Sequence, residues 1–317
     1  MHAIRHHSFG PADVLRFEQL ADLTPSPGQI RIAVEAAGVH VLDTSIRSGA
    51  AFGLGPAPDL PVIPGREVAG TVDRVGEGVD KSWIGRRVVA HLGMGGGGYA
   101  EQAVVAAERA YPIPEGLDAA AAVAAIGTGR TASAILEFAA LSPDDVVAVT
   151  SAAGGLGALL LQGIRAAGAS AVGIAGGAEK AAIVESLGAV AIDHQRADWS
   201  QSVSDHGPYT VVLDGVGGTI GETLYRQLSS GGRLVRYGWF GEEGNAYDDP
   251  QRRVIEVLGP PIMSRLAEFE RAALAAAASG ERVPLVGSTF ALRDAADAHR
   301  AIEARESIGK VVLVVGA

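Results

Sequence analysis

The sequence predicts an α/β protein in which a β-rich part precedes a doubly wound parallel sheet. Its 317 residues are enough for about two domains. The first 120 or so residues carry strand patterns broken by glycine and proline, whereas later residues alternate between strand and helix patterns, as in βαβ units. The 43 glycines and the low aromatic content of 5% fit a parallel sheet built from small aliphatic residues.

The β-rich part contains three clear strand patterns. Residues 29–36 alternate polar and apolar side chains, which is the pattern of a half-buried strand, and residues 68–75 and 87–91 predict two more. Glycine and proline between them predict turns, as in small barrels and irregular antiparallel domains. Residues 52–55 form either a mobile lid or an inert loop.

The second part begins with a helical pattern over residues 119–141, interrupted at residues 127–129. Five strands follow, separated by helices around residues 156–167 and 179–187. The strands are predicted at residues 145–151, 171–175, 189–193, 210–214 and 233–237. The tail carries helices near residues 267–278 and 293–305 and a last strand at 310–315.

Charge and composition exclude several classes of function. The net charge of −10 repels phosphate backbones, so we expect no nucleic-acid partner. The absence of cysteine excludes disulfides, thiolate zinc sites and cysteine nucleophiles, and it agrees with a reducing compartment. Residues 1–5 lack the apolar run of a signal peptide, and the alanine-rich residues 119–125 are too few to span a bilayer. We therefore expect a cytoplasmic protein without a membrane partner.

A glycine-rich turn is the sharpest motif. Residues 152–157 (AAGGLG) follow an apolar strand and precede a helix. Small residues there allow a tight turn, a close approach to a pyrophosphate and close packing of helix on strand, and the free amides of the helix N-terminus attract the phosphates. The strand-turn-helix context favours a dinucleotide site over a purely structural loop.

The end of the next strand predicts which coenzyme binds. An NAD site usually places an acid there to bind the ribose hydroxyls. Here Gly176 and Gly177 end the strand, and Lys180, one of only three lysines in the chain, follows one helical turn later. This arrangement favours the 2′-phosphate of NADPH. Two alternatives remain: Lys180 is a solvated surface lysine paired with Glu179 or Glu185, or Glu179 is itself the NAD acid.

Ordered motifs along nearly the whole chain point to one family. They are residues 38–49 (GVHVLDTSIRSG), 64–70 (PGREVAG), 98–101 (GYAE), the glycine turn, 214–217 (DGVG) and 309–313 (GKVVL). Together they resemble the zinc-independent quinone oxidoreductase branch of the medium-chain dehydrogenase/reductase superfamily, which includes the zeta-crystallins. The resemblance implies a GroES-like catalytic domain formed by residues 1–120 and 263–317, with a Rossmann nucleotide-binding domain, residues 121–262, inserted between them. It also implies a homodimer, in which residues 254–258 form an edge strand that pairs two Rossmann sheets.

The resemblance also predicts the metal content and the cofactor contacts. Positions that hold Cys, His and Cys around zinc in the alcohol dehydrogenase branch hold His40, Arg66 and a residue near Gly127 here, so we expect no metal. The implied NADPH contacts are Thr131, Ala153, Gly154, Gly155, Leu156, Gly157, Gly176, Lys180, His194, Val216, Gly238 and Lys310. His194 departs from the family pattern, which often has an aromatic residue beside the adenosine phosphate.

The implied reaction is hydride transfer from NADPH to a quinone or an α,β-unsaturated carbonyl compound, without a metal. Enoyl-thioester reduction and non-catalytic NADPH binding, as a sensor or structural protein, remain alternatives. We expect His40 to hydrogen-bond the substrate carbonyl, with Asp43 orienting it or Ser45 assisting. The competing interpretation is that His40 only packs at a domain interface and bonds a backbone carbonyl.

Overall fold

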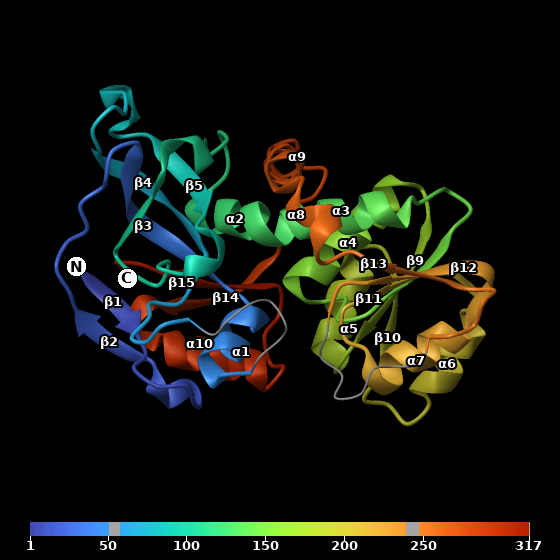
Figure 1. Ribbon diagram of the computed structural model, residues 1–317. Helices are drawn as coiled ribbons and strands as arrows, with labels where there is room; N and C mark the ends of the chain where they lie inside the picture. Colours follow the sequence, from blue (N-terminus) through green and yellow to red (C-terminus); the bar gives the residue numbers. More distant parts are fainter. Residues whose placement is uncertain (51–57, 239–246, 317) are drawn as a thin grey trace. The chain divides into compact units, whose positions relative to one another are not determined.

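The computed structural model describes residues 1–50, 58–238 and 247–316, which fall into two compact units (Figure 1). The first unit comprises Met1–Gly127 and Pro284–Ala317, and the second comprises Thr128–Val283. Residues 52–55, for which the sequence leaves a lid or an inert loop open, lie outside the described residues.

The first unit is built around a mainly antiparallel sheet. Its strand order is β14-β15-β3-β4-β5-β7, with β6 also paired to β3, and a separate ribbon joins β1 to β2. Its described elements are β1 (His2–Arg5), β2 (Arg16–Gln19), β3 (Gln29–Val39), α1 (Val41–Ser48), β4 (Glu67–Val75), β5 (Arg87–His91), β6 (Gln102–Ala106), β7 (Ala110–Pro112), α2 (Ala119–Ala124), β14 (Val286–Ala291), α10 (Ala295–Glu303) and β15 (Lys310–Val314).

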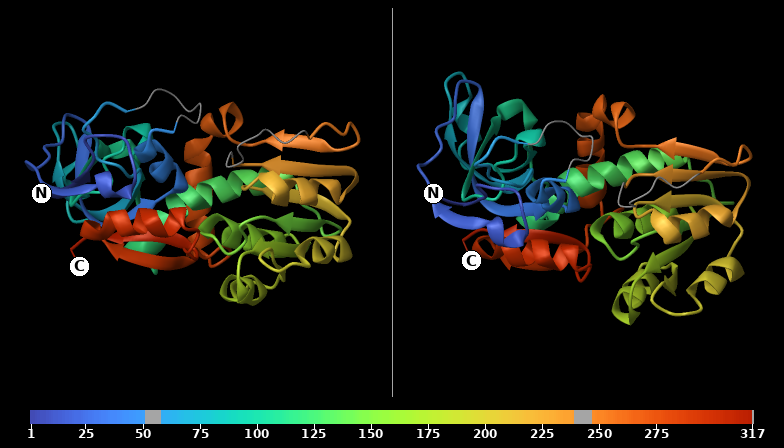
Figure 2. Two further views of the ribbon diagram at one scale, coloured as in Figure 1. Left: turned by 90° about the horizontal axis from the view of Figure 1, so that it is seen from below. Right: turned by 60° about the horizontal axis from the view of Figure 1, so that its bottom comes forward.

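The two ends of the chain complete this sheet together. The last strand, β15, pairs antiparallel with β3, so that Val311 lies opposite Val39 and Leu313 opposite Ala37. Figure 2 shows the red C-terminal segment beside the blue N-terminal strands. The Ile, Val and Leu side chains of these strands are buried in one shared core. The discontinuous, β-rich domain predicted from the sequence is therefore present.

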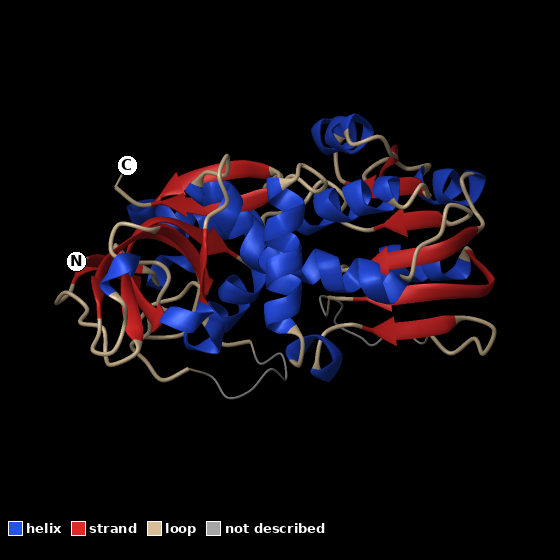
Figure 3. Ribbon diagram, turned by 90° about the horizontal axis from the view of Figure 1, so that it is seen from above, coloured by secondary structure: helices blue, strands red, loops and turns tan. Residues whose placement is uncertain are grey.

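The second unit is a parallel sheet of six strands in the order β10-β9-β8-β11-β12-β13, which lie side by side in Figure 3. Its described elements are α3 (Arg130–Ala139), β8 (Val146–Val149), α4 (Gly155–Ala166), β9 (Ser170–Ala175), α5 (Ala178–Ser186), β10 (Val190–Asp193), α6 (Trp199–Asp205), β11 (Tyr209–Asp214), α7 (Gly218–Arg226), β12 (Leu228–Arg236), β13 (Arg253–Glu256), α8 (Pro260–Met263) and α9 (Leu266–Ala278). The strand β13, which the sequence predicts as an edge strand, ends this order.

Helices cover both faces of the parallel sheet. Successive strand residues point to opposite faces, so Val211 joins the core under α3, α4 and α9, whereas Val212 joins the core under α6 and α7. Both cores consist mainly of buried aliphatic residues, with Phe269 in the first and Tyr209 and Tyr225 in the second. This arrangement confirms the predicted α/β class with a doubly wound Rossmann sheet.

The interruption predicted in the first long helix is a widened turn. The helix α2 continues into the π-helical turn Ala125–Gly129 and then into α3. The stretch Ala119–Ala139 is long and apolar enough to cross a membrane, but 67% of its most apolar window is buried within the protein, as in a core helix. π-helical turns of this kind are frequent at functional sites.

Both domain boundaries differ from the sequence-based expectation. The sequence assigns residues 263–317 to the β-rich domain, whereas residues 263–283 remain with the second unit and the return begins at Pro284. The cause is α9, whose Phe269 is buried in the same core as Ile135 of α3. An ion pair of 2.8 Å between Arg130 and Glu270 joins the same two helices. The first boundary likewise lies at Gly127 rather than at residue 120.

Candidate functional site

The predicted glycine turn lies where the order of the parallel strands reverses. The chain runs from β8 to β9 and β10 on one side, and then returns to place β11 on the other side of β8. In sheets of this type, ligands bind beyond the carboxyl ends of the strands at this reversal. The turn that follows β8 occupies this position and leads into α4.

The packing of this turn requires glycine. A Cβ added to Gly157 would lie 2.4 Å from the carbonyl oxygen of Ser151 and 2.6 Å from the Cα of Ala152, so the helix is pressed against the turn. Gly154 is the N-cap of α4 and supplies no side-chain cap, so the N-terminal amides of the helix stay available for an anion. Ala153, Gly155 and Leu156 lie in the same turn and the first residues of the helix.

The ends of β9 and β10 form the neighbouring part of this edge. The His194 ring lies over Gly176, because a Cβ on Gly176 would meet His194 Nε2 at 2.8 Å. One oxygen of Asp193 accepts hydrogen bonds from the amides of Gly177 (2.8 Å) and Gln195 (3.0 Å), which lower the pKa of this carboxyl. The Asp193 carboxylate therefore already accepts hydrogen bonds from two backbone amides. Lys180 lies in the first turn of α5, immediately after these amides.

The ends of β11 and β12 meet beside the glycine turn. Asp214 Oδ1 accepts hydrogen bonds from the Thr150 hydroxyl (3.0 Å) and from the Val216 amide (2.9 Å), which joins the end of β8 to the loop after β11. A Cβ on Gly238 would lie 2.1 Å from the carbonyl oxygen of Gly215, so these two loops are in close contact. The structure thus brings the predicted residues that follow β8, β9, β10, β11 and β12 to one edge of the sheet.

In the first unit, three ionisable side chains meet at the predicted catalytic histidine. His40 Nε2 lies 2.7 Å from Lys310 Nζ and 2.6 Å from Glu67 Oε1, and Lys310 Nζ lies 3.0 Å from Glu67 Oε2. We call these three residues the buried trio. The Glu67 side chain is fully buried and that of Lys310 is 5% exposed, whereas the His40 side chain is 24% exposed. The imidazole is therefore the part of the trio that a substrate can reach.

Two glycines make room for the Glu67 carboxylate. A Cβ on Gly38 of β3 would lie 2.3 Å from Glu67 Oε2, and a Cβ on Gly127 of the π-helical turn would lie 1.3 Å from Glu67 Oε1. Any side chain at either position would displace the carboxylate. The widened turn and its glycine therefore form part of the same site as the buried trio.

Burial and neighbouring groups shift the pKa of each side chain in the buried trio. Burial lowers the pKa of His40, so its imidazole is neutral near pH 7. Burial alone would raise the pKa of Glu67, but its interactions with His40 and Lys310 outweigh burial and hold the pKa well below its usual value. Burial lowers the pKa of Lys310, against the attraction of Glu67. The trio at rest combines a carboxylate, an ammonium and a neutral imidazole.

Asp43 and Ser45 have different partners from those that the sequence predicts. The Asp43 carboxylate accepts hydrogen bonds from the His40 backbone amide (2.9 Å), the Tyr99 hydroxyl (3.2 Å) and Arg66 Nε (3.3 Å), so it holds the start of α1 rather than the imidazole. Ser45 donates its hydroxyl to the carbonyl oxygen of Val41 (3.1 Å), within its own helix. The imidazole is held instead by Glu67 and Lys310.

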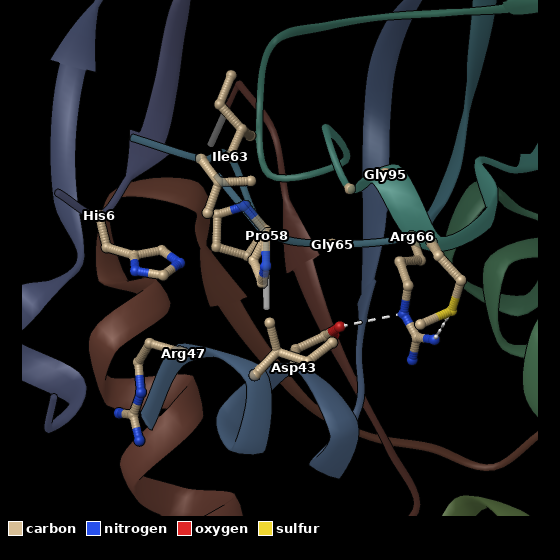
Figure 4. A pocket seen from close by; sticks show the side chains of 13 residues that line it. His6, Asp43, Arg47, Pro58, Ile63, Gly65, Arg66 and Gly95 are labelled. Atoms are coloured by element: carbon tan, nitrogen blue, oxygen red, sulfur yellow. Dashed lines mark hydrogen bonds and ion pairs between the residues drawn. The ribbon is translucent and has the colours of Figure 1, made fainter. Parts of the chain in front are cut away.

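A pocket in the first unit adjoins Asp43 and Arg66. It holds about 350 Å³ of space, part of which is open to solvent. In Figure 4 the Asp43 carboxylate and the Arg66 guanidinium point toward each other, and Arg66 Nη1 approaches the Met94 sulfur at 3.6 Å. The apolar side chains of Ile46, Val62 and Ile63 line the rest. The pocket thus combines an apolar wall with two guanidinium groups, those of Arg47 and Arg66.

The donor set does not fit a metal ion. Of the three positions that the resemblance matches to zinc ligands, one holds the guanidinium of Arg66, and the other lies near Ile126 and Gly127, neither of which has a side chain that can ligate a metal. The third, His40, already contacts an ammonium through Nε2. In the described part of the chain, no group of three or more His, Cys, Asp or Glu side chains is placed to hold a metal ion.

Comparisons with known proteins agree with this geometry. The family model for the alcohol dehydrogenase GroES-like domain matches residues 26–115, and that for the zinc-binding dehydrogenase matches residues 187–313. The quinone oxidoreductase of Sus scrofa is 32% identical over 99% of this chain and 98% of its own length. The chain belongs to the quinone oxidoreductase family of the medium-chain dehydrogenase/reductase superfamily. The resemblance stated from the sequence motifs is therefore confirmed.

A further relative is named as a reductase, and a similar solved structure contains NADPH. The 2-haloacrylate reductase of a Burkholderia species is 30% identical over 99% of this chain and 98% of its own length. The solved structure of the Escherichia coli quinone oxidoreductase, which is complexed with NADPH, has a TM-score of 0.86 and 27% identity and covers 99% of this chain and 100% of that one.

Two of the predicted cofactor residues, Thr131 and Lys310, lie in different units of the structure. Thr131 lies in the first turn of α3, in the second unit. Lys310 is predicted as a cofactor contact, but its ammonium is buried against Glu67 and His40. Glu67 is a site residue that the sequence motifs did not single out. The available signal was an acid directly before the small apolar residues 68–70 at the start of a predicted strand, since a buried carboxylate needs a partner.

Proposed function

We propose that this chain is an NADPH-dependent reductase that transfers a hydride, without a metal, to a quinone or an α,β-unsaturated carbonyl compound. The observation that carries the proposal is the edge of the parallel sheet. It joins a glycine-lined helix N-terminus to Lys180 and His194, while the nearby acid, Asp193, is engaged by backbone amides. The names of the relatives from Sus scrofa and Burkholderia support the reaction class, and the NADPH complex of the Escherichia coli enzyme supports the coenzyme.

The residues present fit NADPH. Close packing at Gly157 and the uncapped N-terminus of α4 suit a pyrophosphate, and Lys180 suits the 2′-phosphate, beside which the His194 ring can lie. When bound, NADPH supplies the hydride. Val216 and Gly238 line the same edge, and we assign them, together with Thr131, to coenzyme contact.

On the substrate side, we assign anion stabilisation to His40. Hydride addition to an electron-poor carbon places negative charge on the substrate oxygen, and a fixed neutral donor in a poorly solvated site stabilises it. The imidazole is held by two buried partners and remains partly exposed, which suits this role. Asp43 positions the backbone of His40 and also lines the open, partly apolar pocket beside Arg66.

Metal independence follows from the same residues. Zinc in related enzymes acidifies an alcohol, whereas reduction of an enone or quinone needs only a donor for the developing anion. Arg66 and Gly127 cannot ligate a metal, and Lys310 already supplies a buried positive charge beside His40.

We further propose that the enzyme is cytoplasmic and that it forms a homodimer through β13.

The coenzyme assignment is tested with Lys180→Ala. We expect the wild type to prefer NADPH over NADH by at least about tenfold, because one charge-assisted contact is worth roughly 1.5–3 kcal/mol. The variant should bind NADPH more weakly by the same factor and NADH almost unchanged, as measured by fluorescence titration. Lys81→Ala, at an exposed lysine of the first unit, is the matched control. Equal weakening for both coenzymes in Lys180→Ala would remove Lys180 from the 2′-phosphate site.

Substrate panels separate the remaining alternatives. Steady-state NADPH oxidation with a simple quinone, an enone and an enoyl thioester distinguishes the proposed activity from enoyl-thioester reduction. Tight NADPH binding with no turnover of any of the three would instead establish a binding protein.

A further inference from the structure

His40 Nε2 has two close partners that make opposite demands on it. Lys310 Nζ, at 2.7 Å, is an ammonium that can only donate, so it requires a lone pair on Nε2. Glu67 Oε1, at 2.6 Å, belongs to a carboxylate that can only accept, so it requires a proton on Nε2. One nitrogen cannot meet both demands at once.

The two tautomers of a neutral imidazole meet these demands one after the other. With the proton on Nδ1, the Nε2 lone pair accepts from Lys310. With the proton on Nε2, the ring donates to Glu67 instead. Nε2 thus lies close to both an ammonium and a carboxylate, so the ring has one partner near for each tautomer.

We infer that Lys310 is the source of the proton that completes the reduction and that His40 relays it to the substrate. The inference rests on the proposed reductase function. After hydride transfer the substrate is an enolate or a related anion. The Nδ1–H bond of His40 breaks and its proton goes to this anion, while an N–H bond of Lys310 breaks and its proton moves to Nε2. Lys310 is left as a neutral amine, and the imidazole carries its proton on Nε2. After the product leaves, the Nε2 proton returns to Lys310, while Nδ1 of the partly exposed ring takes a proton from water, which becomes hydroxide.

Burial makes the imidazole the route between Lys310 and a substrate. The side chains of Lys310 and Glu67 are 5% and 0% exposed, whereas that of His40 is 24% exposed. A proton held on Lys310 therefore reaches a substrate through the imidazole ring. Gly38 and Gly127 keep the Glu67 carboxylate at its position, so the ring retains both partners.

The surrounding charges support this direction of transfer. Burial lowers the pKa of Lys310, which makes its ammonium a stronger acid than a lysine in water. Arg66 acts in the same direction on both Lys310 and His40, whereas Glu67 and Asp43 favour the charged ammonium. His91, from β5, adds a smaller influence that lowers the pKa of Glu67. These groups together keep one mobile proton on the Lys310–His40 pair.

Lys310→Met tests the inference, because methionine keeps the length and the apolar stem but removes the proton. The readout compares two substrates. An enone yields an enolate that needs a proton, whereas a quinone with electron-withdrawing chlorines yields a hydroquinone anion that can leave unprotonated. We expect turnover of the enone to fall by about 10²-fold or more, and that of the chlorinated quinone by less than about threefold. A merely structural role would lower both by the same factor.

The pH profile supplies a second readout. Wild-type turnover of the enone should fall as the pH rises through the lowered pKa of Lys310, and the variant should lack this alkaline limb. Lys310→Met leaves the Glu67 charge unpaired, so Lys310→Met/Glu67→Gln is made alongside it to keep the trio neutral, with Lys81→Met as the matched control. Thermal unfolding and NADPH titration confirm folded protein.

Three results would overturn the relay. They are equal losses for both substrates in the folded double variant, an unchanged alkaline limb, or enone turnover within threefold of the wild type. Failure of the proposed function is distinct, because the wild type itself would then reduce neither substrate.

Discussion

Replacing Gly157 with alanine tests whether a pyrophosphate rests on the glycine turn. The new Cβ would lie 2.4 Å from the Ser151 carbonyl oxygen, where an ordinary contact begins near 3.4 Å. The three atoms that it meets, this oxygen and the Cα and carbonyl carbon of Ala152, are all backbone, so no side-chain rotation relieves the overlap. The start of α4 must therefore move away from the turn by about 1 Å.

The movement predicts a loss of coenzyme affinity larger than the loss of stability. A shift of about 1 Å stretches a hydrogen bond of about 2.9 Å beyond any useful length. Losing two amide bonds to a charged phosphate, at roughly 1.5 kcal/mol each, weakens binding by about 3 kcal/mol, or more than 100-fold. Overpacking costs about 1–3 kcal/mol of folding stability, and the better helix propensity of alanine offsets about 1 kcal/mol of this.

NADPH fluorescence titration and thermal unfolding, measured on the same samples, give both quantities. Gly163→Ala is the matched control, since Gly163 lies in the same helix but its added Cβ would meet Leu136 Cδ1 at 2.3 Å, a side-chain atom that can rotate away. This control should lose stability but keep its NADPH affinity. A folded Gly157→Ala protein that binds NADPH as tightly as the wild type would refute the placement of the coenzyme on this turn.

Four further predictions concern other parts of the molecule. His40→Ala should lower kcat by roughly 10² to 10³ with NADPH affinity little changed, and a change below about threefold would remove His40 from the chemistry. Activity should survive exhaustive chelation, and elemental analysis should find no stoichiometric zinc; one zinc per chain together with activity lost on chelation contradicts this. Light scattering at micromolar concentration should give a dimer mass, because the apolar edge strand β13 is a liability unless paired; a monomer would refute it. Burial alone would raise the pKa of Asp145, but hydrogen bonds from Arg233 and Thr210 lower it from 3.8 to about 2, so at most about 2 kcal/mol of stability present above pH 4 is lost as the pH falls toward 2. Asp145→Asn should flatten this part of the denaturation profile, and an unchanged profile would show that the pair is not coupled to folding.

The periodic parts of the fold were predictable because they depend on local patterns. The strand expected at residues 145–151 is β8, Val146–Val149, and the glycine turn follows it as the motif requires. The interruption at residues 127–129 lies within the π-helical turn Ala125–Gly129. Each of these features is encoded within a few neighbouring residues, so sequence reasoning places it well.

Features that depend on distant partners were not predictable. The alanine-rich pattern of α9 shows that one face is buried but not against which helix, so its packing on α3 could not be foreseen. Asp43 carries a carboxylate three residues after His40, and spacing alone does not show that it accepts from the backbone amide rather than the ring. The meeting of Glu67 with Lys310 joins residues on β4 and β15, at opposite ends of the chain, and only the sheet pairing brings them together.

The buried trio also explains why a metal site would be hard to restore in this chain. A third ligand at Gly127 would collide with the Glu67 carboxylate, whose Oε1 lies 1.3 Å from where a Cβ would stand. Moving Glu67 would leave the ammonium of Lys310 buried without its partner, which is strongly destabilising for a charge in a poorly solvated site. A metal at His40 Nε2 would in addition have to displace that ammonium from 2.7 Å. The changes are therefore coupled: ligands at residues 66 and 127 become useful only if Glu67 and Lys310 change with them, so substitutions at the ligand positions alone should lower stability without creating a metal site.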